Sequence, residues 1–175
     1  MWTTLRQIAT TGIVTEPAPQ ADPALKLRDA LQERILGIMG RALCIRAVDA
    51  GSCNGCELEI HALNNPVYNL EGLGIRFVAS PRHADLLLVT GPVARSMEAA
   101  LLATFEATPE PRLVVAIGDC GCTGGVFGES YASCGRVSNV IPVDVAVPGC
   151  PPSPVRIMAA ILAAITPGAA AGRGS

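Results

Sequence analysis

The segment Arg112–Gly118 reads RLVVAIG, and the segment Asp85–Thr90 reads DLLLVT. Both contain short apolar runs without the polar–apolar alternation of a strand that has one face in water. Runs of this kind are typical of strands in a parallel sheet whose two faces are both covered by helices. We therefore predict that these two segments form the centre of such a sheet.

Weaker strand patterns lie on either side of this pair, at Cys44–Asp49, Ile75–Ala79 and Val143–Val147. Helical patterns separate the strands, at Gly55–Leu63, Arg95–Phe105 and Pro154–Ile165. Strands that alternate with helices along a chain predict parallel β-α-β units. The expected fold is therefore a doubly wound, flavodoxin-like α/β domain with an N-terminal amphipathic helix.

We predict three regions along the chain, which are 1–43, 44–166 and 167–175. Residues 1–21 mix Thr, Pro and Ala without periodicity, so we expect an extension that orders on a partner. Residues 44–166 form the α/β domain, and the Ala- and Gly-rich tail from Pro167 is expected to be flexible.

The helix of the first region is expected to start with Asp22 as its N-cap and Pro23 in its first turn. Its apolar residues recur at helical spacing, namely Leu25, Leu31, Ile35, Ile38 and Met39. Two interpretations remain open. The helix either packs on its own domain, or it docks on a neighbouring subunit or at a membrane interface.

Composition excludes several classes of protein. The chain has 175 residues and a net charge of −2, so it has no basic excess for nucleic-acid binding. Charged residues make up only 16%, which suggests that partner subunits cover part of the surface. No apolar run reaches the roughly 20 residues that span a bilayer, and the first residues show no export signal.

Seven cysteines in a chain without an export signal indicate metal ligation rather than disulfides. Cys53 and Cys56 follow the first predicted strand, and Cys120 and Cys150 each follow another. Ligands of open α/β sheets bind at the carboxyl ends of the strands, where these loops meet. We therefore predict that these four cysteines hold one [4Fe–4S] cluster.

Two other chemistries compete with the cluster. Structural zinc is usually held by two short Cys pairs, whereas here only Cys53 and Cys56 are close in sequence. A dithiol redox pair would use those two and leave Cys120 and Cys150 without a role. Of the other cysteines, we expect Cys44 to be a small core residue, whereas Cys122 is the main rival to Cys120, and Cys134 also flanks the site.

Polar residues near the cysteines have expected roles as well. We expect Asp49 and Asp119 to cap loops through their side chains. Glu57 and Glu59 either complement the dipole of the helix in whose first turn they lie, or carry protons or pair with a partner's basic groups. His61 is expected on a surface or at an interface rather than as a ligand.

Three segments resemble the small-subunit family shared by [NiFe]-hydrogenases and respiratory complex I. They are Gly51–Ile60, Gly118–Cys120 with Gly124–Phe127, and Pro142–Pro152. Complex I relatives have two adjacent cysteines at the first site, whereas Asn54 and Gly55 separate Cys53 and Cys56 here, as in the hydrogenases. The chain thus resembles the small subunit of an energy-converting, membrane-associated [NiFe]-hydrogenase or a related complex.

This resemblance implies an electron-transfer role in an oxidoreductase complex, without catalysis by this chain alone. The implied partners are a large subunit of the nickel–iron type, a ferredoxin-like iron–sulfur subunit and integral membrane subunits. The implied location is the cytoplasmic face of the cell membrane. The alternative is the equivalent cluster subunit of an NADH- or ferredoxin-to-quinone oxidoreductase. Because no cysteine follows Cys150, the resemblance implies ligands for one cluster only.

Overall fold

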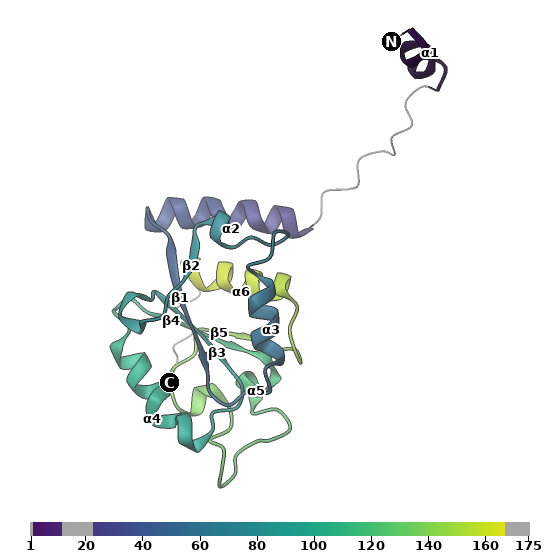
Figure 1. Cartoon of the computed structure of the whole chain (residues 1–175). Helices are drawn as coiled ribbons and strands as arrows, with labels where there is room; N and C mark the ends of the chain where they lie inside the picture. The colour runs from purple at the N-terminus through teal and green to yellow at the C-terminus, as the bar shows by residue number, and fades with distance from the viewer. Residues whose placement is uncertain (1, 12–22, 167–175) are drawn as a thin grey trace.

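The computed structural model describes residues 2–11 and 23–166, and its centre is a sheet of five parallel strands in the order β2-β1-β3-β4-β5 (Figure 1). The strands are β1 (Leu43–Asp49), β2 (Ile75–Phe77), β3 (Leu86–Thr90), β4 (Leu113–Ile117) and β5 (Val145–Val147). This is the flavodoxin-like strand order, so the predicted fold class is confirmed.

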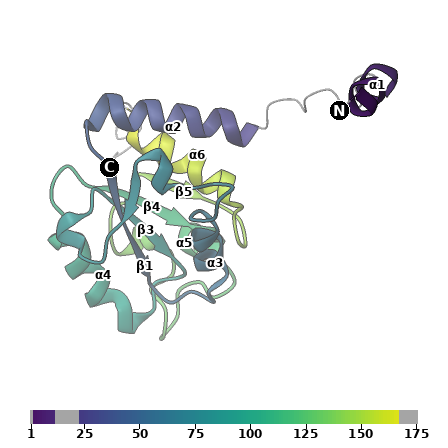
Figure 2. The ribbon, with the colours of Figure 1, turned by 45° about the horizontal axis from the view of Figure 1, so that its top comes forward.

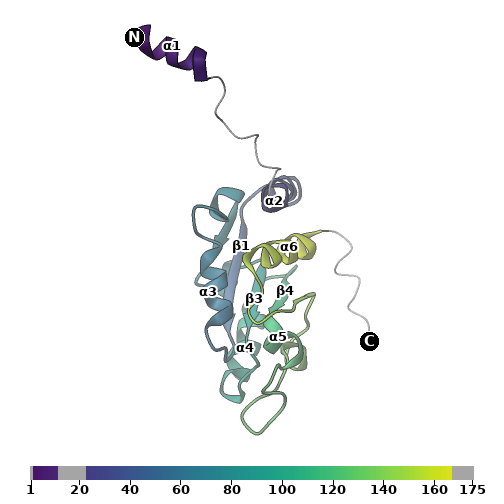
Figure 3. The ribbon, with the colours of Figure 1, turned by 90° about the vertical axis from the view of Figure 1, so that its right-hand side faces the viewer.

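Helices cover both faces of the sheet (Figure 3). The α-helices are α1 (Trp2–Thr11), α2 (Pro23–Met39), α3 (Gly55–Ala62), α4 (Arg95–Ala107), α5 (Gly118–Thr123) and α6 (Pro154–Ile165). Short 3-10 turns lie at Glu71–Leu73, Pro81–His83 and Val137–Asn139. The sequence predicted α3, α4 and α6 to within two residues at each end.

The core is divided by the sheet into two apolar layers. One layer joins α2, α3 and α6 to the sheet, and the other joins α4 and the segment 134–141 to its opposite face. All five residues of β3 are buried, because this strand has neighbours on both sides and layers on both faces. Continuous burial explains why its sequence shows no alternation.

Helix α2 packs on its own domain beside α6 (Figure 2). The side chains of Leu31 and Ile35 are fully buried in the same layer as Ile157 and Ile161 of α6. The domain itself therefore occupies this face of α2, as the first of the two interpretations has it. Docking of α2 on other subunits stays a prediction, as do the boundaries at residues 43 and 166. The predicted tail 167–175 lies outside the described residues.

Two elements correct the predictions. Residues 2–11 form helix α1, although no regular structure was expected there without a partner. Threonine hydroxyls support its last turn, since Thr10 Oγ1 donates to Arg6 O at 2.9 Å and Thr11 Oγ1 donates to Gln7 O at 2.6 Å. The second correction is α5, which places Cys120 on a short helix rather than in a loop.

Replacing Ile35 by Ala should lower the free energy of unfolding of the full-length chain by about 2–5 kcal/mol, because it opens a cavity in the core between α2 and α6. Urea unfolding followed by far-UV circular dichroism measures this change. The matched control is Gln32→Ala on the exposed side of the same helix, which should stay within about 0.5 kcal/mol of the parent. Equal effects of both variants would contradict the packing of α2 on the core.

Candidate functional site

The segments that follow four of the five strands meet at one edge of the sheet. A cavity at this edge is lined by the residues Ser52, Cys53, Gly55, Cys56, Gly91, Pro92, Gly118, Asp119, Cys120, Phe127, Gly149, Cys150 and Pro151. They follow β1, β3, β4 and β5 along the chain. The carboxyl edge of the sheet therefore gathers the four predicted cysteines around one space.

The loop after β1 is held by its own polar side chains. Asp49 Oδ1 accepts hydrogen bonds from the backbone N–H groups of Gly51 and Ser52, both at 2.8 Å. Ser52 Oγ accepts from Asn54 N–H at 3.1 Å, and Asn54 adopts a left-handed conformation with φ of 72° just before α3. This turn leaves Cys53 exposed and places Cys56 in the first turn of α3.

A second link joins the segments that carry Cys120 and Cys150. Asp119 Oδ1 accepts from Gly149 N–H at 2.7 Å, and Asp119 N–H donates to Gly149 O at 2.9 Å. This pair ties the first turn of α5 to the loop after β5. The predicted capping roles of Asp49 and Asp119 are thus confirmed.

Glycines allow the backbone to approach the sulfurs closely. A Cβ atom at Gly118 would lie 2.7 Å from Cys56 Sγ, and one at Gly125 would lie 2.8 Å from Cys120 Sγ. Both glycines also have positive φ, at 84° and 56°, which favours glycine over other residues. A side chain at either position would displace a sulfur that lines the cavity.

The four sulfurs are close enough to influence one another electrostatically. Burial raises the pKa of Cys56 to about 12, with further contributions from the negative charges of Glu57, Cys53, Cys120 and Cys150. Burial also raises the pKa of Cys120, followed by the charges of Cys150 and Cys53. Without a positive centre, the thiols of Cys56 and Cys120 therefore resist ionisation at neutral pH.

The other three cysteines point elsewhere and do not line this cavity. Cys122 Sγ contacts the backbone oxygen of Ala116 at 3.7 Å, and Cys134 Sγ contacts Glu98 Oε2 at 3.3 Å. Cys44 lies at the opposite end of β1 and is only half-buried, outside both core layers, so it is not the core residue that was expected. Cys120, and not its rival Cys122, therefore faces the other three cysteines.

Among the described residues, no three His, Cys, Asp or Glu side chains lie together at the spacing that holds a metal ion. In the same part of the chain, no helix is both long and apolar enough to cross a membrane.

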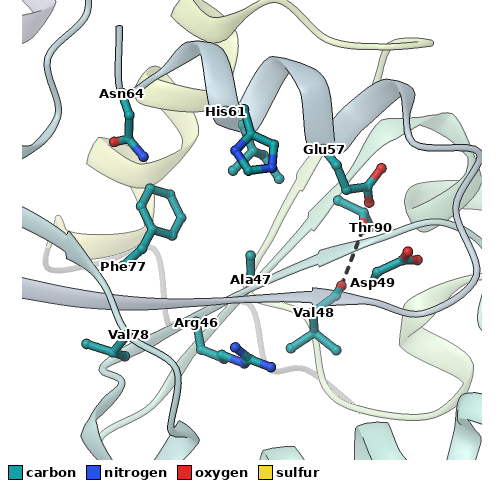
Figure 4. A pocket seen from close by; sticks show the side chains of 11 residues that line it. Arg46, Ala47, Val48, Asp49, Glu57, His61, Asn64, Phe77, Val78 and Thr90 are labelled. Carbon is teal, nitrogen blue, oxygen red and sulfur yellow. Dashed lines mark hydrogen bonds between the residues drawn. The ribbon is translucent and has the colours of Figure 1, made fainter.

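A larger cavity of about 320 Å³ lies beside the cysteine site, between α3 and β1 (Figure 4). No sequence pattern predicted it. Glu57 and His61 of α3 face it, and Phe77 at the end of β2 lines its other end. Glu57 Oε2 accepts a hydrogen bond from the Ser52 hydroxyl, whereas Oε1 is buried without a partner among the described residues. No motif in the sequence marks this cavity, because one of its walls depends on where β2 ends at Phe77.

Fold and site together define an α/β protein with a cysteine-rich site at the carboxyl edge of a parallel sheet. Residues 53–164 match the family described as NADH ubiquinone oxidoreductase, 20 Kd subunit. This match covers more than half of the chain, so the chain belongs to that family, which confirms the family predicted from the sequence.

Several curated relatives are similar over most of this chain. A probable membrane-bound hydrogenase subunit mbhJ of Pyrococcus furiosus is 44% identical over 79% of this chain and 84% of its own length. Formate hydrogenlyase subunit 7 of Escherichia coli is 42% identical over 71% of this chain, which spans only 49% of that relative. An NADH-quinone oxidoreductase subunit of Desulfovibrio desulfuricans is 45% identical over 66% of this chain and 62% of its own length.

Solved structures share the fold. A chain of the membrane-bound sulfane sulfur reductase (MBS), an archaeal respiratory membrane complex, has a TM-score of 0.64 at 29% identity and covers 87% of this chain and 78% of that chain. A chain of an NAD⁺-reducing [NiFe]-hydrogenase has a TM-score of 0.52 at 19% identity, over 65% of this chain and 85% of that one. The latter likeness concerns the fold alone.

Replacing Gly118 by Ala should reduce loading of the predicted iron–sulfur cluster, because the new Cβ would press on Cys56 Sγ. Gly128→Ala is the matched control, since Gly128 also has positive φ, at 55°, but nothing lies within 4 Å of its Cβ position. Both variants should lose about 1 kcal/mol of stability to backbone strain. Iron and sulfide per chain after anaerobic reconstitution should fall only for Gly118→Ala, and an equal loss in both variants would contradict the close-approach explanation.

Proposed function

We propose that this chain is an electron-transfer subunit that holds one [4Fe–4S] cluster on the Sγ atoms of Cys53, Cys56, Cys120 and Cys150. The observation that carries this proposal is that these four cysteines, which follow three different strands, line one cavity. Sets of four cysteine thiolates are the usual ligands of such clusters.

The donor set fits a cationic iron–sulfur centre. Burial, and then the charges of neighbouring cysteines, raise the pKa of Cys56 and of Cys120. A positive centre would stabilise thiolates in such a setting. When bound, the cluster supplies one-electron acceptance and release. The chain's own part is to hold the four sulfurs, to limit water around them and to position the site at the edge of the sheet.

Within a larger assembly, the chain would relay electrons between a ferredoxin-like subunit and the active site of a large subunit. Support comes from the relatives named as subunits of formate hydrogenlyase and of a membrane-bound hydrogenase. Integral membrane subunits would then hold it peripherally at the cytoplasmic face of the membrane. The spacing of Cys53 and Cys56 favours a hydrogenase-type complex.

A second candidate is the cluster subunit of a complex I-type quinone oxidoreductase. The 45% identity to the NADH-quinone oxidoreductase relative from Desulfovibrio desulfuricans favours it. Metal analysis of the purified intact complex separates the two candidates, because a hydrogenase-type large subunit would carry nickel. Absence of nickel together with quinone reduction would favour the second candidate.

The purified, anaerobically handled chain should contain about four iron and four sulfide per polypeptide, as one cubane cluster requires. Reduction should produce the electron paramagnetic resonance signal of a single cluster. Stoichiometric zinc without labile sulfide would instead identify a zinc-stabilised module and overturn the proposal.

Replacing any one of the four proposed ligands by Ala should abolish the signal of the intact cluster. The matched control is Cys122→Ala, which removes a neighbouring thiol that points to Ala116 and not into the cavity. It should retain iron, sulfide and the signal at parent levels. Loss of the cluster in Cys122→Ala together with its retention in Cys120→Ala would reverse the ligand assignment.

A further inference from the structure

Strand β1 extends beyond its partner β2 at the end nearest the cysteine site. The pairing of β1 with β2 ends where Ile45 lies opposite Phe77, and Val78 N–H then donates to Ile45 O at 2.9 Å. On its other side, β1 stays paired with β3 as far as Asp49, opposite Thr90. The last residues of β1 are therefore at an edge of the sheet on one side only.

Backbone groups at this edge alternate in direction along β1. Ala50 N–H donates to Thr90 O at 3.0 Å, and Thr90 Oγ1 donates to Val48 O at 3.3 Å, so these two residues direct their backbone groups toward β3. In a strand, the intervening Ala47 and Asp49 direct theirs to the opposite side. In the described part of the chain, no strand pairs with that side of them.

This edge is recessed rather than flat. The cavity of about 320 Å³ runs alongside it, with α3 as one wall and Phe77 and Val78 as the other (Figure 4). Unpaired strand edges attract further strands, and proteins commonly protect them with charges, bulges or a covering loop. Within residues 2–11 and 23–166 this edge is left open, in a groove whose walls could hold an added segment in place.

Charges of opposite sign lie on the two sides of β1. Glu57 lies on the α3 side with Ala47, and its buried Oε1 has no partner in the described chain (Figure 4). Arg46 lies on the other side of the strand, because neighbouring residues of a strand point to opposite faces (Figure 4). Among the described residues, Arg46 forms no ion pair.

We propose that an extended segment of a partner protein adds to the free edge of β1 at Ala47–Asp49. Its backbone would bond to the groups of Ala47 and Asp49, as in β-strand addition. Because cross-strand neighbours share a face, a basic side chain of the segment would face Glu57 and the next, acidic side chain would face Arg46. The proposal shares with the proposed function only the requirement for partner subunits.

The proposed occupant is an extended segment because the free groups repeat along a strand and the charges alternate between its faces. A docking helix has its backbone groups satisfied internally and could not bond to Ala47 and Asp49. A segment of this same chain would meet the same backbone requirement. Comparing the free chain with the complex distinguishes these two occupants.

Hydrogen exchange at single-residue resolution tests the edge directly. In the free full-length chain, the amides of Ala47 and Asp49 should exchange at least about tenfold faster than that of Ala50, which is bonded to Thr90. In the purified intact complex, their exchange should slow by at least about tenfold. Protection in the free chain would identify a segment of this chain as the occupant, and unchanged exchange in the complex would exclude strand addition; either result overturns the proposal.

A charge reversal tests the occupant's chemistry. Arg46→Glu should lower the amount of partner protein that stays bound in the purified complex by at least about tenfold. The new carboxylate would repel the acidic side chain of the segment. The matched control is Arg76→Glu, an exposed arginine on β2 that does not line the cavity, and it should leave retention unchanged.

The iron and sulfide content shows whether each variant keeps its site. The exchange rate of the Ala50 amide shows whether it keeps its fold. Equal retention of the partner by Arg46→Glu and the parent would overturn the assigned charge pattern. If the parent chain contains no cluster, the proposed function is wrong. The hydrogen-exchange result at β1 would still hold.

Discussion

Four cysteines line one cavity at the carboxyl edge of the sheet, where each thiolate would repel the others. Burial and neighbouring negative charges raise the pKa of Cys56 to about 12, so this thiol resists ionisation at neutral pH. The surrounding chain nevertheless maintains it, through the Asp49 turn, the link between Asp119 and Gly149, and the close approach of Gly118 to Cys56. The proposed iron–sulfur cluster, a positive centre that accepts four thiolates, would account for all three features.

The parallel sheet is what makes this convergence possible. Parallel strands end at the same edge, so loops from distant parts of the chain meet there without a dedicated scaffold. The packed core holds the strands that carry these segments, because β3 is buried on both faces and α2 and α6 pack over one layer. Rigid strands thus fix the starting points of the loops, and glycines and aspartates shape the loops themselves.

The sequence predicted the features that depend on local pattern. Continuous apolar runs indicated β3 and β4, and the positions of the cysteines after strands indicated one shared edge. Helix α5 was missed because GDCGCT has the composition of a loop, whereas backbone bonding and the Asp119–Gly149 link hold it as a helix. Helix α1 was missed because its threonines have low helix propensity. The groove beside β1 was missed because it depends on where β2 stops pairing, which is set by tertiary packing.

A high-resolution cryo-electron microscopy map of the intact complex would show whether one iron–sulfur cluster sits on the four proposed sulfurs. We expect density for a cubane cluster in the cavity at the carboxyl edge of the sheet, joined to the Sγ atoms of Cys53, Cys56, Cys120 and Cys150. Density for a single ion, or for a cluster joined to Cys122 in place of Cys120, would show the ligand assignment to be wrong.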